Sequence, residues 1–465
     1  MDKNDARNLH RGWEQTNLIH RLCHALEIAS LTVEHLVPAG FTDLKNPSAS
    51  IRPEKPIAET AVLLHGATAA IAHPEVSERI HRVARQLIPH ARSSQIRLGL
   101  ALNPALAFDY SLAHIVLTRL GYPDPGFQEL LSQCRSAQAH AGRERLPHRM
   151  LEQEWIDTLW KECCPEAHRR LERMARLSIL NQPMDLFSAT DDDLYAFTHA
   201  IMYVTGFHQN PALLPRSRAA LLAEAESVLA RCLDAQDYDL AGEILLAWPL
   251  TGKHWSPAAT FAFHVLATVE DKAGFLPTPA TRVPELQSRE GTDRTLYLLA
   301  TAYHTAYVMG LLCAAALQRG CAPPTSISTK HGKPGSAKQI LPLLDDSNKT
   351  PHWRDTFDKL DSSQADALAS VLFDIALQRS AGRRDFAALD KTLRLGHTLG
   401  LTTTPAASQV AELLERVATC AGTLPPSPPT SHISNPLTPQ SAPLIKPTII
   451  SSTPRAELRP MTPQT

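Results

Sequence analysis

The stretch DRTLYLLATAYHTAYVMGLLCAAALQR, residues 293–319, decides the fold of this chain. Between Arg294 and Arg319 it contains no charged residue and no proline. A helix of this composition is apolar on nearly every side, so other elements must bury it. We therefore expect the rest of the chain to pack around this helix. His304 lies near its middle, and a buried imidazole needs a hydrogen-bonding partner.

The same stretch is also long enough to cross a membrane, since about 20 apolar residues suffice. Against a membrane span stand His304, three threonines, the lack of an aromatic belt at the two ends, and the lack of a second run like it. The sequence therefore favours the inner helix of a large helical domain and predicts no membrane partner.

Composition narrows the classes of partner and compartment. The 465 residues include 46 Lys and Arg against 47 Asp and Glu, so no global field attracts nucleic acid, and we predict none as a partner. The eight cysteines form no C-x-x-C pair, which argues against a zinc knuckle and a disulfide framework. The polar, mixed-charge N-terminus predicts no secretory signal. Together these features predict a cytoplasmic protein.

Hydrophobic periodicity is helical along the chain, and neither sustained alternation nor a hairpin turn sequence appears. We predict an all-α protein, an α/α toroid-like fold or an array of helical hairpins. Its tail contains eleven prolines among Ser and Thr, which predicts a disordered docking segment. The sequence divides into five predicted parts. They are an N-terminal helical region (residues 1–98), a helical core (99–320), a linker (321–350), C-terminal helices (351–422) and the tail (423–465).

Histidines recur in helices that also contain an acid and a tyrosine. At SATDDDLYAFTHAIMYVTGF, residues 188–207, Thr190 and Asp193 form a capping box, and the helix is apolar on two faces, so His199 is buried either way. Three such helices suggest a degenerate repeat of helix pairs whose inner polar groups point into a central cavity. The predicted cavity-lining residues are His114, Tyr195, Tyr203, Tyr303 and Tyr307.

Asp239 and Glu243 lie four residues apart in YDLAGEILLAW, residues 238–248, and hence on one face of one helix. With His199 and His304 they offer nitrogen and oxygen donors for a divalent metal such as zinc, iron or manganese. The competing interpretation is structural. In that interpretation Asp239 caps a helix, Glu243 is solvated, and both histidines are hydrogen-bonded core residues.

Other catalytic signals are weak. His148 with Glu152 and Glu154 offers acid–base groups, but in a helix rich in charge. No phosphate loop, dinucleotide fingerprint, nucleophile elbow or H-E-x-x-H pair occurs in the sequence. These absences leave an enzyme with a dispersed site or a binding protein, and the catalytic residues and reaction are not predicted.

The segment from Tyr303 to Leu311, with YHT, Tyr307 and Gly310, follows DKAGF at residues 271–275 by some thirty residues. This pattern resembles a repeat of the α/α-toroid superfamily, which includes protein prenyltransferase β subunits and triterpene cyclases. The resemblance implies a zinc-ligand role for His304. The chain lacks the Asp-x-Cys ligand pair of the first group and the Asp-rich motif of the second, so neither activity transfers.

A broader likeness covers residues 100–320. The segments AFDYSLAHIVLTRLGYPD, LPHRMLEQEWI, DLYAFTHAIMYVTGF, YDLAGEILLAW and YHTAYVMGLL resemble a family of functionally uncharacterised bacterial domains, some of them associated with specialised-metabolite gene clusters. The resemblance supports the boundaries of the core domain.

Two functions from different classes are compatible with these features. The first is a cavity protein that binds a small molecule or peptide around a divalent metal, zinc or iron, as a tailoring enzyme of bacterial specialised metabolism. The second is a non-catalytic scaffold that recognises another protein and uses the Pro-rich tail for docking.

Overall fold

The structure is a computed structural model. It describes residues 13–41, 51–136, 142–161, 165–207, 214–252, 254–318, 320–329, 332–345 and 351–423. The disorder predicted for the Pro-rich tail falls on residues 424–465, which lie outside the described residues.

The described part of the chain is helical, which confirms the all-α prediction. Its ranges contain no β-strand, although Phe41 and Ile51 form an isolated antiparallel bridge. The α-helices are α1 Gln15–Glu34, α2 Glu54–Ala67, α3 Pro74–Ala91, α4 Ser94–Leu102, α5 Ala107–Arg119, α6 Pro125–Ser136, α7 Pro147–Lys161, α8 Pro165–Leu177, α9 Asp191–Thr205, α10 Arg218–Ala235, α11 Tyr238–Leu245, α12 Ala247–Thr251, α13 Pro257–Ala273, α14 Val283–Gln287, α15 Gly291–Ala316, α16 Ser336–Ile340, α17 His352–Phe357, α18 Ser362–Ala367, α19 Ala369–Gly382, α20 Phe386–Leu399 and α21 Pro405–Thr423.

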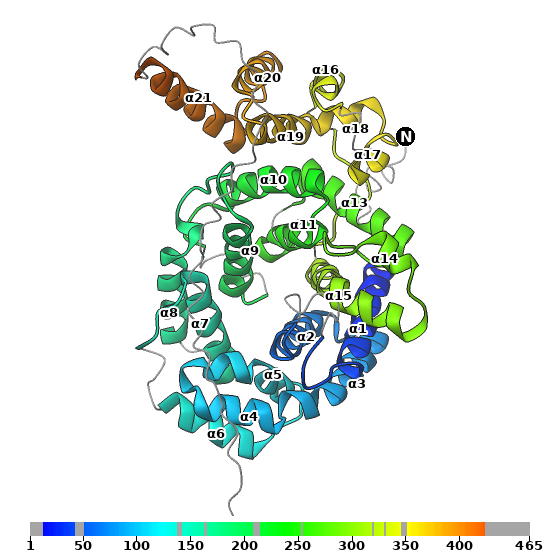
Figure 1. Ribbon diagram of the computed structural model, residues 1–465, viewed down its shortest axis with the longest axis vertical. Coiled ribbons are helices and arrows are strands. Elements are labelled where there is room, and N and C mark those ends of the chain that lie inside the picture. Colours follow the sequence, from blue (N-terminus) through cyan, green and yellow to red (C-terminus); the bar gives the residue numbers. More distant parts are fainter. Residues whose placement is uncertain are drawn as a thin grey trace, which may run out of the picture. The chain divides into compact units, whose positions relative to one another are not determined.

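Six helices form a closed ring. Around it α2 packs on α15, α15 on α11, α11 on α9, α9 on α7, α7 on α5, and α5 returns to α2. Figure 1 shows this ring with α1, α3, α10 and α13 on its outer side. Side chains from the six helices surround one central cavity. The arrangement is toroid-like, as the repeat of apolar helix pairs suggested.

The apolar stretch at residues 293–319 lies mostly within α15, a single helix of 26 residues. Among the described helices it is the one that is by itself long and apolar enough to cross a membrane, and 78% of its most apolar window is buried within the protein. Such burial is typical of the core helix of a globular fold. The prediction of a buried inner helix agrees with this structure.

Small residues let α15 approach its neighbours closely. A Cβ atom at Gly66 of α2 would lie 2.4 Å from Leu311, and one at Gly242 of α11 would lie 2.6 Å from an α15 side chain. A Cβ atom at Gly310 of α15 would lie 2.5 Å from the Cβ of Ala25 on α1. No side chain larger than hydrogen fits at these three positions without movement.

The capping signals read from the sequence are present. Thr190 accepts a hydrogen bond from the backbone N–H of Asp193, and the Asp193 carboxylate accepts one from the backbone N–H of Thr190. This capping box starts α9, and Gly274 in the left-handed conformation ends α13. Local sequence therefore fixes where these helices begin or end.

Residues Met1–Ala418 form one compact unit. Helices α1 and α2 of the predicted N-terminal region pack against α15, so the position predicted as a boundary at residue 98 separates no compact units. The segment predicted as a linker contains α16, and its Cys321 and Ile327 are buried. Long-range apolar contacts, which composition does not reveal, join these segments to the core.

We predict that Gly310→Ala destabilises the protein by up to about 2 kcal/mol. Overpacking against Ala25 costs about 1–3 kcal/mol, and the better helix propensity of alanine offsets about 1 kcal/mol of that cost. The double variant Ala25→Gly with Gly310→Ala removes the clash and should be more stable than the sum of the two single changes predicts. Urea unfolding followed by circular dichroism measures all four proteins.

Gly382→Ala is the matched control, because a Cβ atom at this helical glycine meets nothing within 4 Å. It should be neutral or stabilising. Equal destabilisation at Gly310 and Gly382, or strict additivity of the Ala25 and Gly310 changes, would contradict the close approach of α1 and α15.

Candidate functional site

The central cavity has a volume of about 1170 Å³. Its wall consists mainly of side chains from α2, α5, α7, α9, α11 and α15, the six helices of the ring. Pockets for small-molecule ligands commonly have volumes of about 300–1,000 Å³. The cavity is therefore large enough for a metabolite or a short peptide.

Helix α11 carries the two predicted carboxylates into this cavity. Asp237 caps the helix by accepting a hydrogen bond from the backbone N–H of Leu240, and all eight residues of α11 are buried. Asp239 therefore does not cap the helix, and Glu243 is only 3% exposed rather than solvated. These two parts of the competing structural interpretation are wrong.

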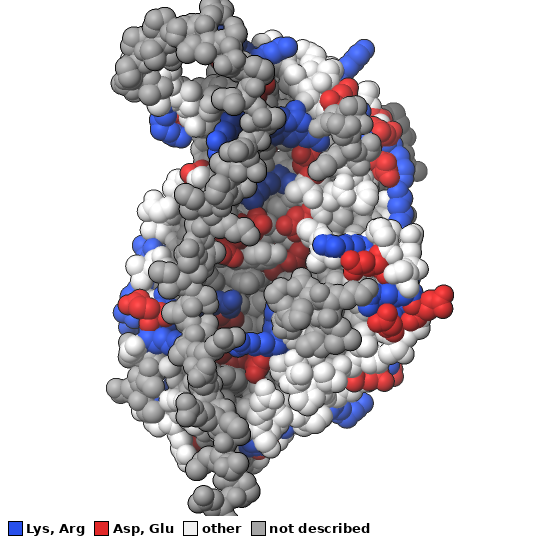
Figure 2. Space-filling model, viewed as in Figure 1, with Lys and Arg blue, Asp and Glu red and all other residues white. Residues whose placement is uncertain are grey.

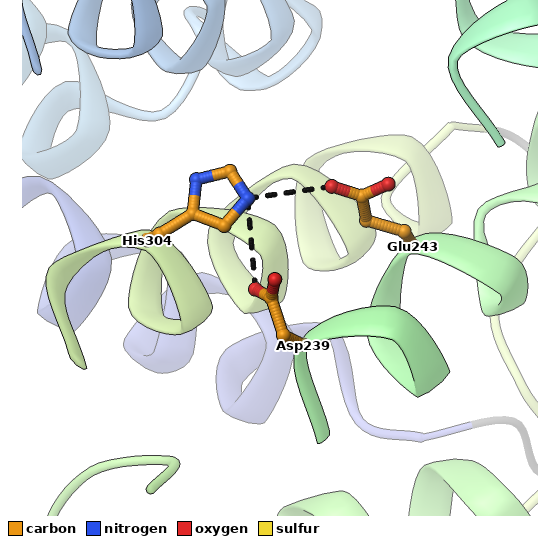
Figure 3. A group of neighbouring side chains, drawn as sticks. All are labelled: Asp239, Glu243 and His304. Carbon is orange, nitrogen blue, oxygen red and sulfur yellow. Dashed lines mark hydrogen bonds and ion pairs between the residues drawn. The ribbon is translucent and has the colours of Figure 1, made fainter. Parts of the chain in front are cut away.

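His304 of α15 faces both carboxylates, as Figure 3 shows. Its Nε2 atom lies 3.3 Å from Oε1 of Glu243 and 3.6 Å from Oδ1 of Asp239. One donor atom from each of the three residues lies within 4.8 Å of the other two. Side chains from two helices that are some sixty residues apart in the chain thus converge on one small volume.

His199 of α9 reaches the same carboxylate from the other side. Its Nε2 atom lies 3.5 Å from Oε2 of Glu243, so the Glu243 carboxylate lies between two imidazoles. Both rings are partly accessible from the cavity, with His199 22% and His304 27% exposed in their side chains. The four residues named from the sequence are therefore neighbours.

Hydroxyl groups hold the outer oxygen atoms of both carboxylates. Tyr195 donates a hydrogen bond of 2.8 Å to Oδ2 of Asp239, and Thr198 donates one of 2.5 Å to Oε2 of Glu243. Both donors lie on α9. The opposite oxygen atoms, Oδ1 of Asp239 and Oε1 of Glu243, face His304.

A third carboxylate orients His304 from behind. Oε2 of Glu59, on α2, lies 3.2 Å from Nδ1 of His304 and accepts a hydrogen bond of 2.5 Å from Tyr303. The carboxylate fixes the ring so that Nε2 points at α11. Glu59 was not identified from the sequence, although a single acid in the apolar stretch AETAVLLHG was a usable signal.

Electrostatic coupling shifts the pKa values of this group. Burial alone would raise the pKa of Glu243, but its interactions with His199 and His304 outweigh burial and lower it. Burial alone would lower the pKa of His304, but Asp239, Glu59 and Glu243 raise it well above the usual value. Glu243 is therefore ionised and His304 protonated at neutral pH in the metal-free protein.

Asp239 behaves differently from Glu243. Burial raises the pKa of Asp239 to about 6, with a further contribution from the negative charge of Glu243 and an opposing one from His304. Its Oδ1 atom is buried and accepts no hydrogen bond. A buried carboxylate oxygen without a hydrogen-bond donor is a costly feature that a bound cation would relieve.

The predicted wall residues divide into two groups. Tyr195, Tyr203 and Tyr307 line the cavity as expected, whereas Tyr303 lies buried behind Glu59 and is not part of the wall. The prediction for His114 is wrong. Its ring is fully buried and stacks on Phe127 of α6, with ring centroids 4.3 Å apart, because α5 turns that face away from the ring centre.

Two of the three acid–base residues noted in the sequence, His148 and Glu152, line the cavity. Both lie on α7, and the His148 ring centroid is 6.4 Å from that of His199. Glu152 accepts a hydrogen bond of 2.9 Å from Tyr203. Glu154 instead pairs with Arg170 of α8, outside the cavity.

The chain belongs to the family defined by the domain of unknown function DUF6895, whose model matches residues 24–314. This match confirms the resemblance to a functionally uncharacterised helical family. The matched region begins in α1 and ends in α15, so the domain contains the entire ring. Comparison with curated proteins and comparison with solved structures each gave no match.

Proposed function

We propose that the cavity binds one divalent metal ion, zinc or iron(II), and acts as the active site of a metal-dependent enzyme. Asp239, Glu243 and His304 would hold the ion, with His199 available as a fourth ligand. The substrate would be a small molecule or a peptide that enters the cavity. A mixed set of imidazole and carboxylate donors suits zinc, iron and manganese.

The main support for this proposal is the set of contacts that Tyr195, Thr198 and Glu59 make to the three inner residues, which we call the second layer. Each of the three inner residues turns one atom toward the shared volume. The other oxygens of Asp239 and Glu243 accept hydrogen bonds from Tyr195 and Thr198, and Nδ1 of His304 lies 3.2 Å from the Glu59 carboxylate. Metal sites in proteins have this organisation, because outer partners fix the tautomer and orientation of each ligand. A solvated acidic patch would not need it.

The distances also fit an ion. Two donors that each lie about 2.1 Å from a tetrahedral zinc are about 3.4 Å apart. The Nε2 atom of His304 lies 3.3 Å from Oε1 of Glu243 and 3.6 Å from Oδ1 of Asp239. An ion between these atoms would also give Oδ1 of Asp239 the partner that it lacks.

A bound divalent ion would supply Lewis acidity toward a carbonyl or phosphoryl oxygen of the substrate. The residues around it would bind and orient that substrate. The rings of His199 and His148 are neighbours in the cavity. Burial lowers the pKa of His148 to about 4, so its neutral ring could accept a proton from a bound substrate.

The proposal includes a cytoplasmic location and a role in bacterial specialised metabolism. Buried Cys23, Cys134, Cys232 and Cys313 form no disulfide, which supports a reducing compartment. The alternative function, a protein-binding scaffold with a Pro-rich docking tail, would take its place if no metal bound.

We predict about one zinc, iron or manganese ion per chain in protein purified without a polyhistidine tag, measured by inductively coupled plasma mass spectrometry. Glu243→Ala and His304→Ala should each lose the ion. Zinc at 100 times its dissociation constant should stabilise the metal-free wild type by about 2.7 kcal/mol, because only the folded state presents the site. Thermal unfolding with and without zinc measures this effect.

Asp374→Asn is the matched control, because Asp374 is a buried acid held by Ser227 and Thr404 outside the cavity. It should keep the full metal content. Wild-type protein that contains none of the three metals and shows no thermal shift with zinc or manganese would rule out the metal site.

The second layer gives a separate prediction. Tyr195→Phe and Glu59→Gln should each weaken zinc affinity by roughly 10- to 100-fold while one ion still binds, because each removes an orienting contact of a ligand. Tyr203→Phe removes a wall hydroxyl that contacts Glu152 instead, so its affinity should match wild type. Equal affinities for the Tyr195 and Tyr203 variants in competition titrations would contradict the proposed ligand role of Asp239.

A further inference from the structure

The cavity wall has a strong excess of negative charge. Eight carboxylates line it, against two basic side chains, Lys55 and Arg149. This balance leaves six negative charges, and the protonated His304 reduces it to five in the metal-free protein. One divalent ion bound by a neutral His304 would leave four. Figure 2 shows acidic side chains gathered at the centre of this face, over the ring of Figure 1.

Most of this charge has no Lys or Arg partner within the described residues, although Asp239 and Glu243 lie beside the His304 imidazole. Three of the eight carboxylates lie within 4.0 Å of a Lys or Arg nitrogen: the pairs are Lys55–Glu59, Arg145–Asp109 and Arg149–Glu152. Among the described residues, no such pair forms at Glu54, Asp192, Asp193, Asp239 or Glu243. Asp192 and Asp193 are exposed and the Asp193 carboxylate also caps α9, whereas Glu54 is half-buried. A cation in the cavity would offset this uncompensated negative charge.

Two of these side chains are unsatisfied within the cavity. Asp239 is 91% buried, and its Oδ1 atom accepts no hydrogen bond. Glu54 has a buried Oε2 atom that likewise has no partner. The proposed metal satisfies only the first of them. The Oε2 atom of Glu54 would need a hydrogen-bond donor from a bound substrate.

The hydroxyl groups of the wall also favour a cation. Tyr195 and Tyr203 donate their protons to Asp239 and Glu152. What these groups still present to a ligand are lone pairs and aromatic faces, which attract ammonium groups and repel carboxylate or phosphate. The wall therefore selects by repulsion as well as by attraction.

We infer that the substrate of this cavity is cationic, with one or more protonated amines that bind carboxylates of the wall such as Glu54 and Asp192. The inference rests on the proposed function in taking the cavity as the substrate site, but it does not require the metal. A free polyamine and a lysine-rich peptide present the same chemistry, and the cavity volume of about 1170 Å³ admits either.

The test uses three probes of equal length and different charge, 1,5-diaminopentane, 1,5-pentanediol and glutarate, in isothermal titration calorimetry with and without zinc. The diamine should bind at least tenfold more tightly than the diol, and glutarate should bind most weakly. Affinity for the diamine should fall as salt rises, because the contacts are electrostatic. Acetylated trilysine amide forms a second arm, and tighter binding of this peptide than of the diamine would identify a basic peptide as the substrate.

Variants locate the binding. Glu54→Gln with Asp192→Asn should weaken diamine binding roughly tenfold and leave the metal content unchanged, since neither residue is a proposed ligand. Glu290→Gln removes an exposed carboxylate that does not line the cavity, so it should have no effect. Circular dichroism confirms that each variant is folded.

Binding of glutarate or the diol as tight as that of the diamine, or full diamine affinity in the double variant, would overturn the inference. Metal content with no preference for the diamine would overturn the cationic substrate alone. Preference for the diamine in protein that binds no metal would overturn the metal-dependent function alone and leave the cationic ligand.

Discussion

The burial of α15 is the constraint on which the rest of the structure depends. A helix of 26 residues that is apolar on nearly every side must be covered by several neighbours at once. Glycines at positions 66, 242 and 310 allow α1, α2 and α11 to approach it closely. Because α15 is held between α2 and α11, His304 has a fixed position between a carboxylate from each of them.

Buried charge accounts for the organisation of the site. Glu243 is tolerated in the interior because two imidazoles and the Thr198 hydroxyl surround it. Asp239 and Glu59 add further negative charge around one protonated imidazole, so the group has more carboxylates than its own cations neutralise. This imbalance is the common physical basis of our two proposals, a metal ion bound by Asp239, Glu243 and His304 and a positively charged substrate.

Predictions from the sequence agreed best with the structure where they depended on residues close together in the chain. The capping box at Thr190, the i, i+4 pair on α11 and the end of α13 at Gly274 depend on residues within one turn of each other. The wrong prediction for His114 has the opposite cause. Its helix carries the same acid, tyrosine and histidine pattern, but α5 packs that histidine against α6.

The sequence by itself determined the helical class, the central place of α15, the start of α9 and the end of α13, because periodicity and capping depend on residues close together in the chain. It also indicated four polar side chains that the structure brings together, because polar groups are rare in apolar helices. Only the tertiary structure decided that Glu59 lies behind His304, that Tyr303 lies behind the wall, and that eight carboxylates share one cavity. These facts depend on how α2, α7, α9, α11 and α15 are rotated about their axes when they pack, and that rotation results from contacts between residues far apart in the chain.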